Sequence, residues 1–172
     1  AKGGAIGKKD FGVAFGGGAS DYPDGLGSDA DCVISGSVNF QQAGKVDDFS
    51  IQFAGGKGTT TLSSSLDCSG GFTISMWAKN SSWAAGGSTS YIMITTAGTS
   101  IHLTFMSTSH KKIRTEGGMG DMRTGALALD TWYNIVIRND GTNSSLWVDG
   151  VEAQTASGSM VELTSFVFGI DG

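Results

Sequence analysis

Short stretches in which every second residue is apolar recur along most of this chain. In the clearest of them, Phe72, Ile74 and Met76 alternate with Thr73 and Ser75, as in a strand that buries one face. Similar runs occupy residues 49–53, 91–96, 101–106, 132–138, 145–148, 151–154 and 161–170. Further strands are predicted at 11–15, 33–40, 59–62 and 111–116. No stretch carries the apolar stripe of a three-turn helix, so the pattern predicts an all-β protein.

Turn signals separate these runs. Asp149-Gly150 suits the two positive φ angles of a type I′ turn and predicts a hairpin between the runs on either side. Residues 97–100 predict a second hairpin, and the polar run 111–116 fits an edge strand. Gly accounts for 28 of the 172 residues and Pro for 1, which agrees with many tight turns. Many short strands with frequent turns are typical of a sandwich or barrel.

The chain length suits one domain with a substantial core and is too short for two ordinary domains. Residues 1–45 are rich in Gly and Asp, so we interpret them as an extension that packs on or completes the sandwich. Residues 46–172 are the expected domain. Cys32 and Cys68 are the only cysteines, and either one disulfide or two buried free thiols would fit.

Three segments of the chain carry motifs that are informative together. The first, at 50–79, contains Ser-Ile-Gln-Phe-Ala-Gly and Gly-Phe-Thr-Ile-Ser-Met-Trp-Ala-Lys. The second is Asp-Thr-Trp-Tyr-Asn-Ile-Val-Ile-Arg at 130–138, and the third is Gly-Thr-Asn-Ser-Ser-Leu-Trp-Val-Asp-Gly-Val at 141–151. In this order and spacing, the segments resemble the laminin-G-like jelly-roll family of concanavalin-A-like folds. The resemblance implies an antiparallel two-sheet jelly-roll sandwich of the lectin and glucanase type, and it leaves the ligand open.

The chain departs from this family in ways that bear on function. Ala54 stands where the family often has Asp, and the sequence stops before the family's usual last strand, which we expect the N-terminal residues or a partner chain to supply. Related glycosidases use a pair of carboxylates close together on one strand, whereas Glu116, Glu152 and Glu162 form no such pattern. The sequence therefore predicts a protein that is not an enzyme.

Four acidic residues gather near the N-terminus, namely Asp21, Asp24, Asp29 and Asp31, with two Gly among them. Calcium prefers about six to eight oxygen ligands, often from closely spaced carboxylates. These residues are therefore a candidate calcium site, although their spacing does not match an EF-hand. The alternative is a solvated turn, since Asp and Gly favour turns. No other cofactor is indicated.

Alternation also predicts which side chains point away from the core. The residues that alternate with apolar ones on several strands include tryptophans and polar side chains that would form a ligand-binding face. They are Trp77, His102, Trp132, Asn134, Arg138 and Trp147. Indole rings stack on the C–H faces of sugars, and polar groups bond their hydroxyls. Alternatively, the N-terminal segment or a neighbouring subunit covers these aromatic residues.

Charge and hydropathy narrow the choice of partners. The net charge is −5 with no basic stripe, which argues against nucleic acid. No apolar run reaches the roughly 18 residues of a membrane span. Residues 1–4 lack the apolar segment of a signal peptide, so either a signal was removed or an initiator Met was trimmed. We expect the protein outside the cell or on a virion surface.

Two hypotheses for function follow. The first is a non-catalytic recognition module that binds glycans or a surface protein, for example as a secreted adhesin domain. The second is a structural protein, such as a virion coat, decoration or fibre component, that forms a homo-oligomer or part of a larger assembly. A glycosidase is the weakest alternative, and jelly rolls host all three functions, so the fold alone cannot decide.

Overall fold

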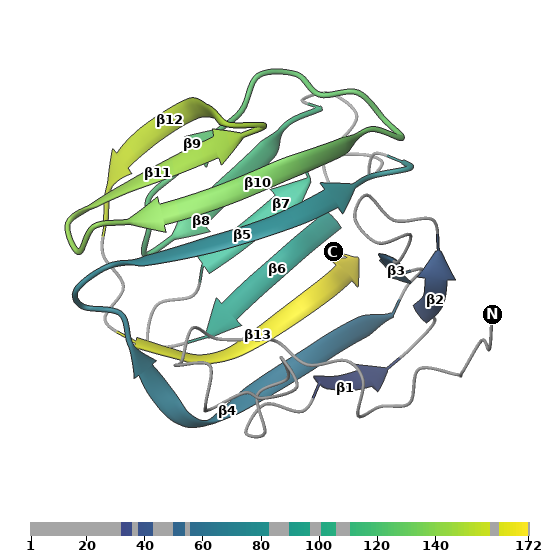
Figure 1. Ribbon diagram of the computed structural model, residues 1–172, viewed down its shortest axis with the longest axis horizontal. Coiled ribbons are helices and arrows are strands. Elements are labelled where there is room, and N and C mark those ends of the chain that lie inside the picture. The colour runs from purple at the N-terminus through teal and green to yellow at the C-terminus, as the bar shows by residue number, and fades with distance from the viewer. Residues whose placement is uncertain are drawn as a thin grey trace.

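The computed structural model consists of β-strands in two main layers (Figure 1). It describes residues 32–35, 38–42, 50–53, 56–82, 90–96, 101–105, 111–158 and 162–171. Every helix or strand assigned within these ranges is a strand. Accordingly, the described residues contain no helix long and apolar enough to cross a bilayer. The predicted all-β class is confirmed.

The larger layer is a seven-stranded sheet in the order β1-β4-β13-β6-β7-β8-β9. Its strands are β1 (Cys32–Ser35), β4 (Lys57–Asp67), β6 (Ser90–Thr96), β7 (Ile101–Phe105), β8 (Ile113–Gly117), β9 (Met122–Arg123) and β13 (Glu162–Asp171). The last strand, β13, lies inside this sheet, between β4 and β6. β1 pairs with β4, so a segment from the first 45 residues belongs to this layer.

The smaller layer is a four-stranded sheet in the order β12-β11-β10-β5, and it lies over the larger sheet (Figure 1). Its strands are β5 (Phe72–Lys79), β10 (Trp132–Asn139), β11 (Asn143–Val148) and β12 (Val151–Ser157). A separate pair is formed by β2 (Val38–Gln42) and β3 (Ser50–Phe53). All strand pairs are antiparallel, and the predicted two-sheet jelly-roll sandwich is confirmed.

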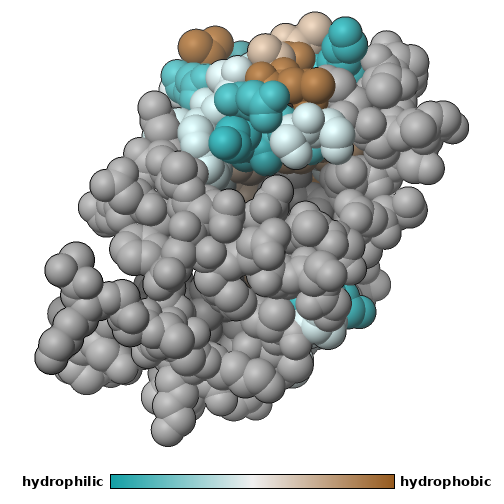
Figure 2. Space-filling view, turned by 90° about the vertical axis from the view of Figure 1, so that its right-hand side faces the viewer, coloured by the Kyte–Doolittle hydropathy of each residue, from teal (hydrophilic) through white to brown (hydrophobic). Residues whose placement is uncertain are grey.

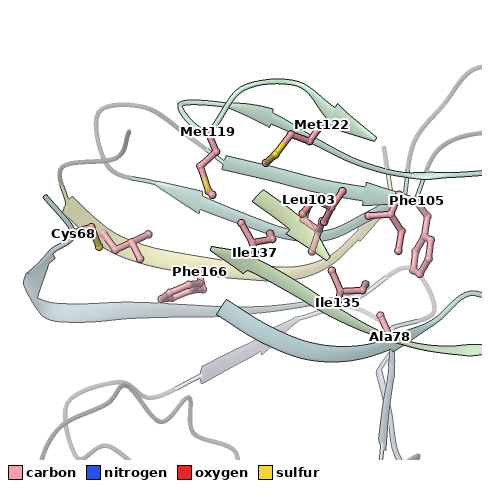
Figure 3. Packing of buried hydrophobic residues seen from close by; sticks show 12 residues of the cluster. Cys68, Ala78, Leu103, Phe105, Met119, Met122, Ile135, Ile137 and Phe166 are labelled. Atoms are coloured by element: carbon pink, nitrogen blue, oxygen red, sulfur yellow. The ribbon is translucent and has the colours of Figure 1, made fainter. Parts of the chain in front are cut away.

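The core lies between the two sheets. Ile135 and Ile137 of β10 and Leu103 of β7 point into this space (Figure 3), and none of the three is exposed. The other buried members of the cluster are Cys68, Ala78, Phe105, Ile113, Met119, Met122, Leu146, Leu163 and Phe166. Ile74 and Met76 of β5 pack against this cluster, as their alternation with polar residues predicted.

The larger sheet differs from the sequence prediction in detail. The predicted edge strand at 111–116 is not an edge, because β8 pairs with β7 on one side and with the two-residue β9 on the other. β9 is too short to show a period, so the sequence did not reveal it. The run 33–40 is divided between β1 and β2, and 59–62 extends into an eleven-residue strand. The predicted strand at 11–15 lies outside the described residues.

The turn between β11 and β12 has the predicted type. Both of its central residues have positive φ, 50° at Asp149 and 79° at Gly150, as a type I′ turn requires. The turn is also tied to β10, because Asp149 Oδ1 accepts a hydrogen bond from Asn134 N at 2.8 Å and Asp149 N donates to Asn134 O at 2.9 Å. This turn therefore fixes the register of three strands.

A buried amide closes the opposite end of the smaller sheet. Asn139 Nδ2 donates to Ser144 Oγ at 2.9 Å and to Gly158 O at 2.7 Å, while its Oδ1 accepts from Gly141 N at 2.7 Å. Since an unpaired buried polar group is costly, these bonds let Asn139 stay inside. A side chain at Gly158 would collide with the carbonyl oxygen of Gly118, so this end is closely packed.

Cys68 is a free thiol in this structure. It is buried, and burial raises its pKa. Cys32 lies on β1 opposite Thr60 of β4. Because Cys68 is free, no disulfide joins the two cysteines within this chain.

We expect Ile137→Ala to lower the free energy of unfolding by about 2–5 kcal/mol, because it removes a fully buried side chain from between the sheets. Urea denaturation followed by circular dichroism measures this loss. The control is Val151→Ala at a side chain that is 69% exposed, where a change below about 0.5 kcal/mol is expected. Equal losses in the two variants would contradict the packing.

Candidate ligand-binding face

The outer surface of the four-stranded sheet combines aromatic and polar side chains. Because alternate residues of β5, β10 and β11 face the core, those between them point away from it. The outward residues are Thr73, Ser75, Trp77, Lys79, Trp132, Asn134, Val136, Arg138, Ser145 and Trp147. We name this surface the tryptophan face, since it holds three of the four tryptophans of the chain.

Trp77 and Trp132 belong to a block of four side chains at one end of this face. Trp132 lies opposite Lys79, and Asn134 lies opposite Trp77. Residues directly opposite each other on neighbouring strands have Cβ atoms about 5 Å apart, so the two indoles occupy opposite corners of the block. The Lys79 ammonium lies 5.3 Å from the centre of the Trp132 ring, within the range of a cation–π contact.

Figure 2 shows this end of the molecule, where β5 ends and β10 begins. Hydrophobic residues, in brown, lie directly beside hydrophilic ones, in teal, at the top of the view. Trp77 is one of the large apolar residues that remain exposed among the described residues, with 40% of its area open to solvent. Trp77 therefore adds an exposed aromatic ring to the polar residues of the face, as a site for an amphipathic ligand would.

Trp147 extends the face onto β11. It lies opposite Val136, and its indole N–H donates to Ser145 Oγ at 2.9 Å. Asn134, on the strand between Trp77 and Trp147, donates from Nδ2 to the backbone oxygen of Met76 at 3.5 Å. The polar edge of Trp147 is thus already bonded within the sheet, which leaves its ring surface for contact with a ligand.

Two cations lie toward opposite ends of the face. Lys79 lies opposite Trp132, and Arg138 lies six residues further along β10, opposite Thr73. At about 3.3 Å per residue the two rows are about 20 Å apart. Neither cation takes part in the ion pairs found among the described residues. The face is therefore a long strip with a positive charge near each end.

The structure brings five of the six predicted ligand-binding residues to this face, but not His102. That residue is on β7 of the other sheet, opposite Glu116 of β8. Alternation shows which side of its own strand a residue occupies, and it does not show which sheet the strand joins. Thr104, two residues further along β7, is buried, and its Oγ1 donates to the backbone oxygen of Arg114 at 3.4 Å.

The outer side of the larger sheet carries a charged cluster that the sequence analysis missed. Asp121 accepts two hydrogen bonds from Arg114, both at 2.8 Å, and two from Arg123, at 3.1 and 2.7 Å. Glu116 also pairs with Arg114. The hydrogen bonds from Arg114 and then Arg123 hold the pKa of Asp121 far below its ordinary value. The signal was the spacing of these charges at every second residue, 114/116 and 121/123, on either side of a Gly-containing turn.

The predicted calcium site at Asp21, Asp24, Asp29 and Asp31 lies outside the described residues. Within the residues that the structure does describe, no group of three or more His, Cys, Asp or Glu side chains is placed to hold a metal ion. Calcium binding by the N-terminal stretch remains a prediction.

The sequence model of the concanavalin A-like lectin/glucanases superfamily matches residues 53–169. The match covers more than half of the chain, and the chain belongs to this superfamily. It agrees with the fold and with the three segments that resembled laminin-G-like domains. Among curated proteins, no sequence matches the chain significantly.

Several solved structures share the fold. They include botulinum neurotoxin type C, studied for cell uptake through two ganglioside molecules (TM-score 0.60, 12% identity), and the binding domain of botulinum neurotoxin DC in complex with SialylT (0.62, 14%) or with rat synaptotagmin II (0.60, 13%). Each match covers 83% of this chain and 38–39% of the other chain. This chain thus spans less than half of those proteins, and at such identities the likeness shows the fold alone.

We expect Asp121→Asn to destabilise the protein at neutral pH, by at most about 1 kcal/mol because the cluster is largely exposed. The folded-state pKa of Asp121 is lowered, so its contribution is present above the unfolded pKa of about 3.9 and is lost as pH falls below that value. Urea midpoints of the two proteins should therefore converge between about pH 5 and pH 2.

The matched control is Glu152→Gln, at an exposed carboxylate that forms none of the ion pairs among the described residues. Its urea midpoint should stay close to that of the wild type at neutral pH. A difference between wild type and Asp121→Asn that grows with acidity would show that the arginines do not stabilise the carboxylate.

Proposed function

We propose that this domain is a non-catalytic surface module that binds glycans through the tryptophan face. The observation that carries the proposal is the gathering of Trp77, Trp132 and Trp147 on one outer sheet surface. The core does not account for them, because the apolar residues that alternate with them already fill the interior. Exposed aromatic residues in a cluster favour a ligand or partner that covers them.

The chemistry of the face suits sugars. A pyranose ring has an apolar C–H side, which stacks on an indole, and a rim of hydroxyl groups. Asn134, Ser75 and Thr73 lie among or beside the rings on the same surface and are available to bond hydroxyl groups. A row of outward side chains along the strands fits an extended saccharide better than a small compact molecule.

The carboxylates of the described residues are poorly suited to glycosidase chemistry. A general acid needs a raised pKa, whereas the arginines lower the pKa of Asp121. Glu116 is bound to one of the same arginines. The outward side chains of β5 and β10 include no carboxylate, and Glu152 of β12, opposite Trp147, stands without a second carboxylate directly beside it on β11. These features support a binding role.

The comparisons support the proposal by analogy only. The similar toxin structures are of proteins described with gangliosides, with SialylT or with a synaptotagmin. A domain that binds such ligands would act outside the cell or on a virion surface, and we propose that location here.

A second candidate is assembly with another subunit through the same face. It is favoured by the 40% exposure of Trp77, which a second protein surface would also cover. In that case the protein would be an oligomer or a component of a larger particle, such as a virion decoration or fibre.

We expect Trp77→Ala to weaken glycan binding about tenfold, because it removes the most accessible stacking surface. A glycan array, with and without calcium, identifies the ligand, and calorimetry then measures affinity. Val151→Ala, at an exposed apolar residue on the β12 edge strand, is the control and should bind as the wild type does. Circular dichroism verifies that both variants fold.

The absence of any glycan ligand on the array would overturn the proposal. If light scattering then showed an oligomer that Trp77→Ala converts to monomer, assembly would be the function of the face. Glycan binding that Trp77→Ala leaves unchanged would place the site elsewhere on the molecule.

We also expect no hydrolysis of the glycans that the protein binds. Incubation of each array ligand with the protein, followed by chromatography of reducing ends, tests this. Turnover that disappears in Glu116→Gln, the carboxylate bound to Arg114, would contradict the non-catalytic assignment. Binding without turnover over the same period would agree with it.

A further inference from the structure

We infer that the tryptophan face selects acidic oligosaccharides, carboxylated or sulfated, over neutral ones of the same length. The inference rests on the proposed function and names the ligand class for the same surface. It depends on the two cations of the face, Lys79 and Arg138, on the contact of Lys79 with Trp132, and on the distance between the two cations.

The charged side chains that point outward from β5 and β10 are both cations, Lys79 and Arg138. This contrasts with the chain as a whole, whose net charge is −5. Both are exposed, and neither joins an ion pair within the described residues. Two unpaired cations beside aromatic rings are complementary to a ligand that is both amphipathic and anionic.

Two carboxylates at turns of the smaller sheet, Asp140 and Asp149, are bound by backbone groups. Glu152 of β12 lies opposite Trp147, and Asp130, whose N–H donates to Asn80 O, precedes β10. Asp140 Oδ1 accepts hydrogen bonds from Thr142 N at 2.9 Å and from Asn143 N at 2.7 Å. Asp140 is close enough to Arg138 for the arginine to contribute to its lowered pKa, although the backbone bonds contribute more. Asp149 Oδ1 is likewise bound to Asn134 N. These carboxylates cap turns, so the guanidinium of Arg138 remains available to an anion.

Trp132 has a different role from Trp77. The Lys79 ammonium lies 5.3 Å from the centre of the Trp132 ring, which restrains an otherwise flexible side chain and keeps its charge on the face. Trp132 is therefore a positioning residue for Lys79, and Trp77 is the stacking surface beside it. The pair gives one end of the site an anion contact and a sugar contact side by side.

The separation of the cations indicates an oligosaccharide. The rows of Lys79 and Arg138 are six residues apart along the strand direction, about 20 Å. Trp77 and Trp147 lie in the rows between them, on the strands that flank β10. A linear glycan laid along β10 would meet both rings and place acidic groups near both ends, whereas a single sugar would reach only one cation.

The experiment compares acidic glycans with neutral glycans of the same length in calorimetry. The probes are an oligosaccharide of uronic acids, its carboxyl-reduced neutral counterpart and a sulfated oligosaccharide. We expect the wild type to bind the acidic probes more tightly, with a preference that decreases as salt is raised.

Lys79→Met and Arg138→Met should each weaken acidic binding about fivefold, the effect of losing an exposed ion pair. Because the sites are far apart, their effects should multiply, and the double variant should lose about 25-fold. None of the three should change neutral binding more than about twofold. The matched control is Lys57→Met, at an exposed lysine on β4 of the other sheet, and Trp132→Leu should reproduce the loss seen with Lys79→Met.

The outcomes distinguish failure of the acidic preference from failure of the proposed glycan-binding function. Equal binding of acidic and neutral glycans, with no effect of the cation variants, would overturn the acidic preference and leave the glycan-binding face intact. Acidic binding that Lys57→Met weakens as much as Lys79→Met would show non-specific attraction and also overturn it. No binding of any probe would remove the proposed function itself.

Discussion

The structure depends on one constraint: two sheets share a single apolar interior, so each strand must present its apolar side chains at every second residue. In β10, Ile135 and Ile137 meet this requirement and are fully buried. The residues between them are then forced outward whatever their chemistry. The tryptophan face is a consequence of this alternation, and its chemistry depends on the residues that the core does not need.

The register of strand pairing determines which outward residues become neighbours on the surface. Pairing of Ile137 with Ile74 across β10 and β5 also sets Asn134 against Trp77 and Trp132 against Lys79. A slip of one residue would bring the indoles into the core and the isoleucines to the solvent. The buried core and the outer face are therefore specified together, which explains how a surface site can be as well defined as the packing beneath it.

Sequence alone predicted the fold and most of the candidate face because both follow from a period of two and from local turn chemistry such as Asp149-Gly150. It could not place His102, since membership of a sheet depends on contacts between distant segments. It also missed the pairing of Arg114 and Arg123 around Asp121, because the two-residue strand β9 carries no period. The local pattern was sufficient to predict which side of its strand a residue occupies. Which residues lie close together depends on the pairing of strands that are distant in the sequence.

The arginine cluster of the larger sheet and the cations of the tryptophan face differ in whether their charges are paired. On the larger sheet, Arg114 and Arg123 donate hydrogen bonds to Asp121, so the charges of that cluster are paired with one another. On the smaller sheet, Lys79 is held by an uncharged ring and Arg138 lacks a salt bridge with the described residues. A cation restrained without being neutralised keeps its attraction for an external anion. The difference between the two surfaces is therefore the physical reason to look for an anionic ligand on the tryptophan face.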